Sequence, residues 1–234
     1  NGSYMQRVTF RQSFLDQDSP RFLLNKGGET TELKYPKEFL VSPSSTSEVA
    51  EVTGDLVFVG YGIIAPELNH NDYADIEVKD KMVVMLSGKP QSFPSEEGAH
   101  FASGYQKGKY AAENGAKGTI VIPTPRSEKA RPYERSLSYI HVPRVRWLKD
   151  DGTPANTFAE LKNGASLSPD TAKMLFADEQ MTLDDIYAEL EEDKSPKAFA
   201  MKSSIALSKK SEFKEITSPN VVAILPGSDP TLAA

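Results

Sequence analysis

The sequence GDLVFVGYGIIAPELNHNDYADIEVKDKMVVMLSG, from Gly54 to Gly88, decides the fold. It holds two short apolar runs, Leu56–Val59 and Met82–Leu86, which are bounded by Gly, Pro and Asp residues. Apolar runs of this length favour buried strands over helices. Pro66 and the polar turn formers after it exclude a continuous helix between the two runs. The stretch therefore predicts two buried strands joined by an irregular polar loop.

The segment Gly60–Ala65, GYGIIA, fits the dinucleotide-binding pattern G-x-G-x-x-G/A, and Asp80 follows about twenty residues after its start. That pattern binds a pyrophosphate only where its end opens a helix whose N-terminal amides meet the phosphates. Here Pro66 and further turn formers follow at once. Asp80 also leads into a strand, whereas the ribose-binding acid should end one. We therefore interpret the segment as a Gly-rich turn without a cofactor.

His70-Asn71-Asp72 resembles an H-x-D pair of metal ligands. A metal site needs further His or carboxylate ligands presented from rigid elements. The chain has only three histidines, and the other two, His100 and His141, lie far away in stretches rich in turn residues. Asn and Asp in such loops usually bond to the backbone in Asx-turns. We therefore predict no metal site in this chain.

A strand–helix–strand unit follows the decisive stretch. Ser103 and Gln106 form a capping box that opens a helix through Asn114, and Gly115 suits its C-terminal cap. The apolar run Thr119–Ile122 then predicts a third buried strand. This order predicts a right-handed crossover packed on a sheet.

The C-terminal half predicts three helices and two strands. A capping box opens a helix over Asn156–Gly164, a second helix runs from Ser168 to about Ala177, and Thr182 caps a third. Apolar residues alternate over Ala198–Leu207, and polar residues separate this half-buried strand from the last one, Asn220–Leu225.

The two ends of the chain are both strand-like. Ser3–Phe10 alternates apolar and polar residues, as a half-buried strand does. A domain inserted in a longer protein would have to leave and re-enter that protein at nearly one place. We therefore predict that Ser3–Phe10 pairs in antiparallel fashion with Asn220–Leu225 to form a stem.

Composition bounds the function. The hydrophobic fraction of 38% is enough for a core, and the net charge of −6 argues against nucleic acid as the main partner. No apolar run approaches the roughly twenty residues that span a bilayer. The absence of cysteine excludes disulfides and thiolate metal sites. The composition is compatible with a secreted or periplasmic bacterial protein, which is the localisation we expect. The start at Asn1 predicts a piece of a longer protein.

The segments GDLVFVGYGIIAPE, NDYADIEVKDKMVVML and KYAAENGAKGTIVI, in this order, resemble the protease-associated (PA) domain. They resemble most the form inserted in the di-zinc aminopeptidases of peptidase family M twenty-eight, relatives of glutamate carboxypeptidase and the transferrin receptor ectodomain. The tail TSPNVVAILPGSDP is similar to the strand by which those enzymes re-enter their catalytic domain. The chain stops before the family's first zinc-binding His-x-Asp motif. The resemblance covers most of residues 49–124 and 165–230.

This resemblance implies a mixed, β-rich α/β fold. We expect a PA-type β-sandwich or partly open barrel with short flanking helices, and a short antiparallel stem formed by the two chain ends. Residues 1–48 would hold the N-terminal stem strands from the host peptidase domain, residues 49–215 the PA domain, and residues 216–234 the re-entry strand.

The residues themselves offer no catalytic set. There is no G-x-S-x-G elbow, no P-loop and no cysteine nucleophile, and no histidine has ligands at metal spacing. We expect a non-catalytic module without a cofactor, whose parent is a zinc-dependent aminopeptidase with its zinc in the catalytic domain. Its partners would be that domain and a peptide or protein substrate, with a role in substrate access. The alternatives are a free-standing PA-type binding domain and an independent hydrolase with an unrecognised site.

The segment Pro132–Trp147 combines arginines and aromatic residues in an otherwise acidic chain. Such residues dominate interface hot spots. Its loop-like composition suits a rim, and we predict that Arg135, Tyr139 and Trp147 contact a peptide or another domain. The alternative is a loop whose long cations lie over the edge of the sheet.

Overall fold

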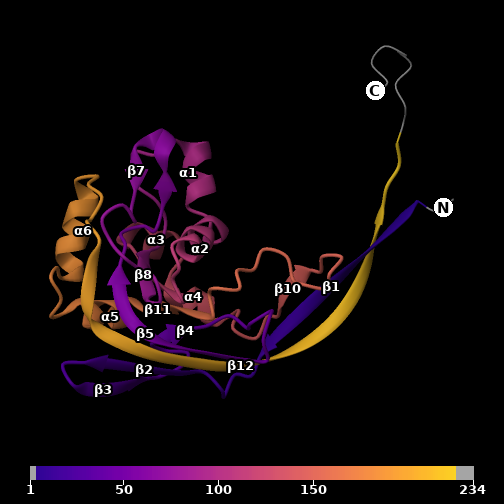
Figure 1. Cartoon of the computed structure of the whole chain (residues 1–234), viewed down its shortest axis with the longest axis horizontal. Helices are drawn as coiled ribbons and strands as arrows, with labels where there is room; N and C mark the ends of the chain where they lie inside the picture. Colours follow the sequence, from indigo (N-terminus) through magenta and orange to yellow (C-terminus); the bar gives the residue numbers. More distant parts are fainter. Residues whose placement is uncertain (1–3, 225–234) are drawn as a thin grey trace, which may run out of the picture.

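The computed structural model describes residues 4–224. Within them the chain forms a ten-stranded mixed sheet that does not close into a barrel, with short helices and a long two-stranded ribbon that projects from the body (Figure 1). The sheet order is β10-β1-β12-β5-β8-β9-β11-β4, and the hairpin of β2 and β3 joins it at β12. The predicted mixed, β-rich α/β fold is confirmed.

The elements have the following bounds. The strands are β1 (Met5–Leu15), β2 (Arg21–Lys26), β3 (Glu29–Leu33), β4 (Phe39–Leu40), β5 (Val49–Phe58), β6 (Ile64–Ala65), β7 (His70–Asn71), β8 (Met82–Leu86), β9 (Gly118–Ile122), β10 (Arg144–Trp147), β11 (Asn163–Leu167) and β12 (Phe199–Val221). The helices are η1 (Pro66–Leu68), α1 (Ser95–Phe101), α2 (Gly104–Glu113), α3 (Pro125–Ala130), α4 (Tyr133–Leu137), α5 (Pro169–Phe176) and α6 (Leu183–Glu191).

The decisive stretch forms the end of β5 and the whole of β8, the two buried strands that it predicts. Strands β5, β8, β9 and β11 run parallel to one another, and all five residues of β8 are buried. Side chains of β8 alternate between two cores, since Met82 and Val84 pack in one cluster and Val83 and Met85 in the other. A strand that is buried on both faces is apolar throughout, which explains its continuous hydrophobic run.

Three predicted helices begin where their caps place them. The hydroxyls of Ser103, Ser168 and Thr182 each accept a hydrogen bond from the backbone N–H three residues later, at the start of α2, α5 and α6. Gly115 follows α2 with a φ of +79°, a conformation that favours glycine at the end of a helix. The helix α2 joins the parallel strands β8 and β9, as the predicted crossover requires.

The helix predicted over Asn156–Gly164 is wrong. The Thr157 hydroxyl donates to the Pro154 carbonyl at 2.8 Å instead of capping a helix, and Asn163 already belongs to β11. The Asn163 side-chain amide donates to the carbonyls of Ala50 and Leu207, at 3.0 and 3.3 Å. Parallel pairing with β9 and these two buried hydrogen bonds override the local helix signal.

The two separate C-terminal strands are also a wrong prediction, because β12 is one continuous strand of 23 residues. Its first part pairs with β2 and β5 in the body, and Ser211–Val221 pairs with β1. The polar residues after Leu207 do not end the strand, because β1 supplies its pairing partners from Ser211 on. From Glu212 on, most of its side chains are exposed to water.

The predicted pairing of the two chain ends is confirmed. Strand β1 pairs in antiparallel fashion with β12, from Met5 opposite Val221 to Leu15 opposite Ser211. Both strands leave the body together and carry the two ends of the described chain to the far end of the ribbon (Figure 1). Ser3 and Leu225, which the prediction included, lie outside the described residues.

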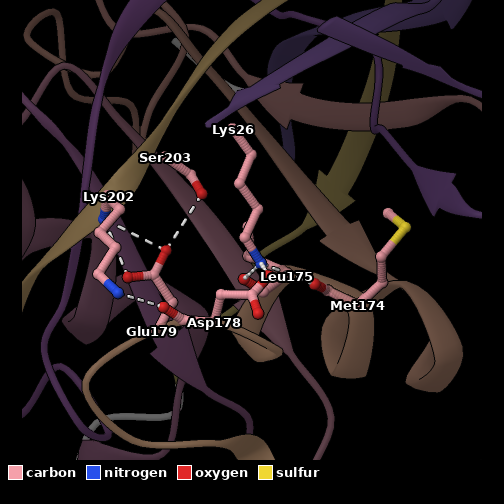
Figure 2. A network of polar contacts seen from close by, with 7 residues as sticks. All are labelled: Lys26, Met174, Leu175, Asp178, Glu179, Lys202 and Ser203. Atoms are coloured by element: carbon pink, nitrogen blue, oxygen red, sulfur yellow. Dashed lines mark hydrogen bonds and ion pairs between the residues drawn. The ribbon is translucent and has the colours of Figure 1, made fainter. Parts of the chain in front are cut away.

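A polar network fixes α5 against β12 (Figure 2). The regular pairing of β12 with β5 is interrupted between Ala200 and Ser204. The Glu179 carboxylate accepts hydrogen bonds there from the Lys202 backbone N–H, at 2.9 Å, and from the Ser203 hydroxyl, at 3.1 Å. The carboxylate thereby pairs with donors that the irregularity would leave without a partner. A buried donor without a partner costs about 1–3 kcal/mol.

Candidate binding groove

Two of the three predicted contact residues lie in one groove. Arg135 and Tyr139 both line a groove of about 850 Å³. Trp147 does not line it; it lies on β10 opposite Phe10 of β1 and is 47% exposed. The structure thus brings Arg135 and Tyr139 together and places Trp147 elsewhere on the surface.

The loop predicted from the composition of residues 132–147 is wrong in part. Helix α4 and strand β10 lie within it, and α3 precedes it. Thr124 and Ser127 form a reciprocal capping box at α3, with Pro125 at the first helical position. The sequence Thr-Pro at 124–125 is a helix-start signal that could have revealed α3.

The groove lies between the sheet and the segment that follows α3. Residues of β9 and β11 line one part of it, and the chain just after β4 lines another. Helix α4 and the stretch from Tyr139 to Arg144 complete the wall. The lining residues are Leu40, Val41, Ser42, Pro43, Thr119, Val121, Ala130, Arg131, Tyr133, Arg135, Ser136, Tyr139, Ile140, Val142, Pro143, Arg144, Gly164, Ala165, Ser166 and Lys209.

The groove is lined by cations without any carboxylate. Its charged lining residues are Arg131, Arg135, Arg144 and Lys209. None of these four forms an ion pair within the described part of the chain. Arg144 donates one hydrogen bond, to the Ser42 hydroxyl at 3.2 Å. The groove therefore carries a net positive charge in a chain whose net charge is −6.

Lys209 is the residue of this groove that sequence reasoning missed. It is 6% exposed, and its ammonium group has no hydrogen bond or ion pair to any described residue. Burial lowers the pKa of Lys209 to about 8. The signal was present, because the alternation that buries Ile205 and Leu207 continues by two residues to Lys209.

The His70–Asp72 pair lies away from the groove and supports the backbone. The Asp72 carboxylate accepts a hydrogen bond from the Ile63 N–H at 2.9 Å, and its other oxygen lies 3.0 Å from His70 Nε2. A Cβ at Gly60 would lie 3.0 Å from this carboxylate, so the turn after β5 closes tightly over Asp72. Among residues 4–224 no group of three or more His, Asp or Glu side chains could hold a metal ion.

A second buried lysine lies near the same turn. Lys107 of α2 donates hydrogen bonds to the carbonyls of Leu86, at 2.8 Å, and Gly88, at 2.6 Å. Burial lowers the pKa of Lys107 to about 7, although the nearby Asp72 opposes this effect. Since its donors already meet carbonyls at the end of β8, Lys107 holds α2 onto the sheet. Lys209 differs from Lys107 because its ammonium group donates no hydrogen bond to a described residue.

No helix among the described residues has the length and apolar character that a membrane span requires.

Three solved structures are similar to this chain. The aminopeptidase from Aneurinibacillus sp. strain AM-1 is 17% identical, with a TM-score of 0.46, over 97% of this chain and 39% of its own. The zinc aminopeptidase BSAP from Bacillus subtilis is 13% identical, with a TM-score of 0.33; the match covers 92% of this chain and 36% of BSAP. The subtilisin-like protease Apa1 from Pseudoalteromonas sp. AS-11 is 14% identical, with a TM-score of 0.34; the match covers 83% of this chain and 35% of Apa1.

The chain thus spans about two fifths, or less, of the length of these structures. No curated protein sequence matches it. The family model of the PA domain matches residues 52–154, which include β5, β8, β9 and the part of the groove wall between Ala130 and Arg144. The predicted resemblance to the PA domain is confirmed over residues 52–154.

Proposed function

We propose that the chain is the non-catalytic PA module of a zinc-dependent aminopeptidase, in which it shapes the access of peptides to the catalytic domain. The observation that carries the proposal is the β1–β12 ribbon. It takes the two ends of the described chain away from the PA body to one place (Figure 1). A domain inserted into a host needs such an arrangement.

Exposed apolar side chains on the ribbon support a partner domain there. Tyr4 is 73% exposed, Val221 75% and Ile224 86%. Apolar residues that cluster at one exposed place mark interaction sites. A catalytic domain packed against the far end of the ribbon would remove these side chains from water.

We further propose the division of the chain that the sequence suggests. Residues 1–48 are assigned to the host; of these, β1 forms the ribbon, whereas β2, β3 and β4 pair within the sheet of the body. Residues 49–215 form the PA domain, and residues 216–234 lead back to the catalytic domain. Zinc is expected in that domain and not in this chain. A secreted or periplasmic location agrees with a peptidase that meets peptides outside the cytoplasm.

The substitution Val221→Lys in the natural full-length protein tests whether a catalytic domain packs against the ribbon. If Val221 is buried against a catalytic domain there, the substitution lowers the free energy of unfolding by about 1–3 kcal/mol. In the 234-residue chain alone, where Val221 is exposed, the change stays within about 0.5 kcal/mol. Denaturant unfolding of both proteins measures the difference.

Val49→Lys is the matched control, because Val49 is 50% exposed at the start of β5 and lies off the ribbon. It is expected to change neither protein by more than about 0.5 kcal/mol. Equal effects of Val221→Lys on the full-length protein and on the chain alone would contradict a domain docked at the ribbon. The chain would then act as a free-standing binding domain.

A further inference from the structure

The groove is lined by four cationic side chains and by no Asp or Glu side chain that could pair with them. Arg131, Arg135 and Arg144 are exposed at its wall, and Lys209 is buried. Lys209 is 6% exposed, so folding removes most of its water, and no described residue supplies an acceptor in return, which is costly for a charged group. The three N–H donors of Lys209 have no acceptor among the described residues. A bound anion would supply both the missing acceptor and the missing charge.

The shape of the groove indicates an organic anion. Its volume of about 850 Å³ is in the range of clefts that bind small organic ligands. Apolar side chains, among them Val121, Ile140 and Val142, line it beside the cations. A phosphate ion would leave these apolar residues without a partner, whereas a peptide with acidic residues presents both carboxylates and aliphatic groups.

We propose that this groove binds the carboxylate of an acidic peptide, with Lys209 as the buried charge and Arg135 and Arg144 as the guanidinium donors at the wall. Guanidinium groups match the two oxygens of a carboxylate, and the lysine adds a compact charge. The carboxylate comes from a Glu or Asp side chain or from a peptide C-terminus. The site does not depend on a peptidase partner, so the chain alone can be tested.

The test measures the binding of three fluorescein-labelled hexapeptides to the 234-residue chain by fluorescence anisotropy. The first alternates Glu and Leu and has an amidated C-terminus, the second replaces each Glu by Gln, and the third is the Gln peptide with a free C-terminal carboxylate. The Glu peptide or the free-acid peptide is expected to bind at least about tenfold more tightly than the amidated Gln peptide. Which of the two does so identifies the source of the carboxylate.

Two variants of β12 form a matched pair. Lys209→Met keeps an apolar chain of similar length in the buried position and is expected to abolish the preference for carboxylate peptides. Lys210→Met removes the same charge from the next residue, which is exposed and does not line the groove, and is expected to retain the preference. Arg144→Gln, at an exposed wall residue, is expected to weaken the preferred peptide about fivefold and to leave the amidated Gln peptide unchanged.

Equal affinities for all three peptides would overturn the proposal. So would equal losses in Lys209→Met and Lys210→Met, because these would reflect net charge alone. Competition separates carboxylate from phosphate: displacement of the peptide by inorganic phosphate at lower concentrations than by glutarate would also overturn it.

Discussion

Replacement of Gly118 by alanine is expected to lower the free energy of unfolding by about 3 kcal/mol or more. Gly118 begins β9, between β8 and β11. A Cβ at this position would lie 2.3 Å from the Asn163 carbonyl oxygen and 2.8 Å from the Met82 sulfur. The carbonyl belongs to the backbone of the paired strand, so the strands themselves would have to separate. Urea unfolding followed by circular dichroism measures the change.

Gly104→Ala is the matched control, because nothing lies within 4 Å of a Cβ at Gly104. Gly104 is the first residue of α2, where alanine is a better helix former by about 1 kcal/mol or less. This variant is expected to be as stable as the parent or slightly more stable. A Gly118→Ala protein with the stability of the parent would show that β9 and β11 do not pair as described.

Lys209→Met is expected to stabilise the chain at pH 7 by about 3 kcal/mol, because it removes a buried charge that has no partner. Burial lowers the pKa of Lys209 from 10.5 to about 8. Below pH 8 the lysine is charged in both the folded and the unfolded chain, and the folded state bears the full cost. Between pH 8 and pH 10.5 the folded lysine loses its proton while the unfolded lysine keeps it, so the cost declines. The advantage of Lys209→Met should therefore be large at pH 7 and small at pH 10.5.

Urea unfolding at both pH values tests this prediction. Tyrosine ionisation at high pH affects both proteins alike and cancels in the difference between them. Lys210→Met is the control and is expected to change stability by less than about 0.5 kcal/mol at either pH. A Lys209→Met protein that is less stable than the parent at pH 7 would mean that the ammonium group has a partner in the folded chain.

The elements that sequence predicted correctly are those with strong local signals. The apolar run Met82–Leu86 and the caps at Ser103, Ser168 and Thr182 are sufficient to place β8, α2, α5 and α6. The errors occur where distant contacts decide. The capping box at Thr157 is present in the sequence, but pairing with β9 makes Asn163 part of a strand. Strand β12 continues through polar residues because β1, almost the whole chain away, supplies its hydrogen bonds.

The groove was only partly predictable. Arg135 and Tyr139 stand out by composition, and the structure places both in its lining. The roles of these two residues and of Trp147 stay predictions. Lys209 could not be assigned to the groove from sequence, because β12 contributes it from a position more than sixty residues after Arg144. Only the folded chain brings Lys209 of β12 and the wall segment to one groove.

The most direct test of the account is the double substitution Arg135→Ala with Tyr139→Ala in the natural full-length protein, measured as kcat/KM on an acidic hexapeptide and on a dipeptide. If the chain presents this groove to peptides, as proposed, kcat/KM for the hexapeptide should fall roughly thirtyfold, which corresponds to about 2 kcal/mol of transition-state stabilisation. The dipeptide has no residues beyond the two that flank the cleaved bond, and it should be hydrolysed as by the parent protein. Unchanged kcat/KM for both substrates, or equal losses for both, would contradict the account.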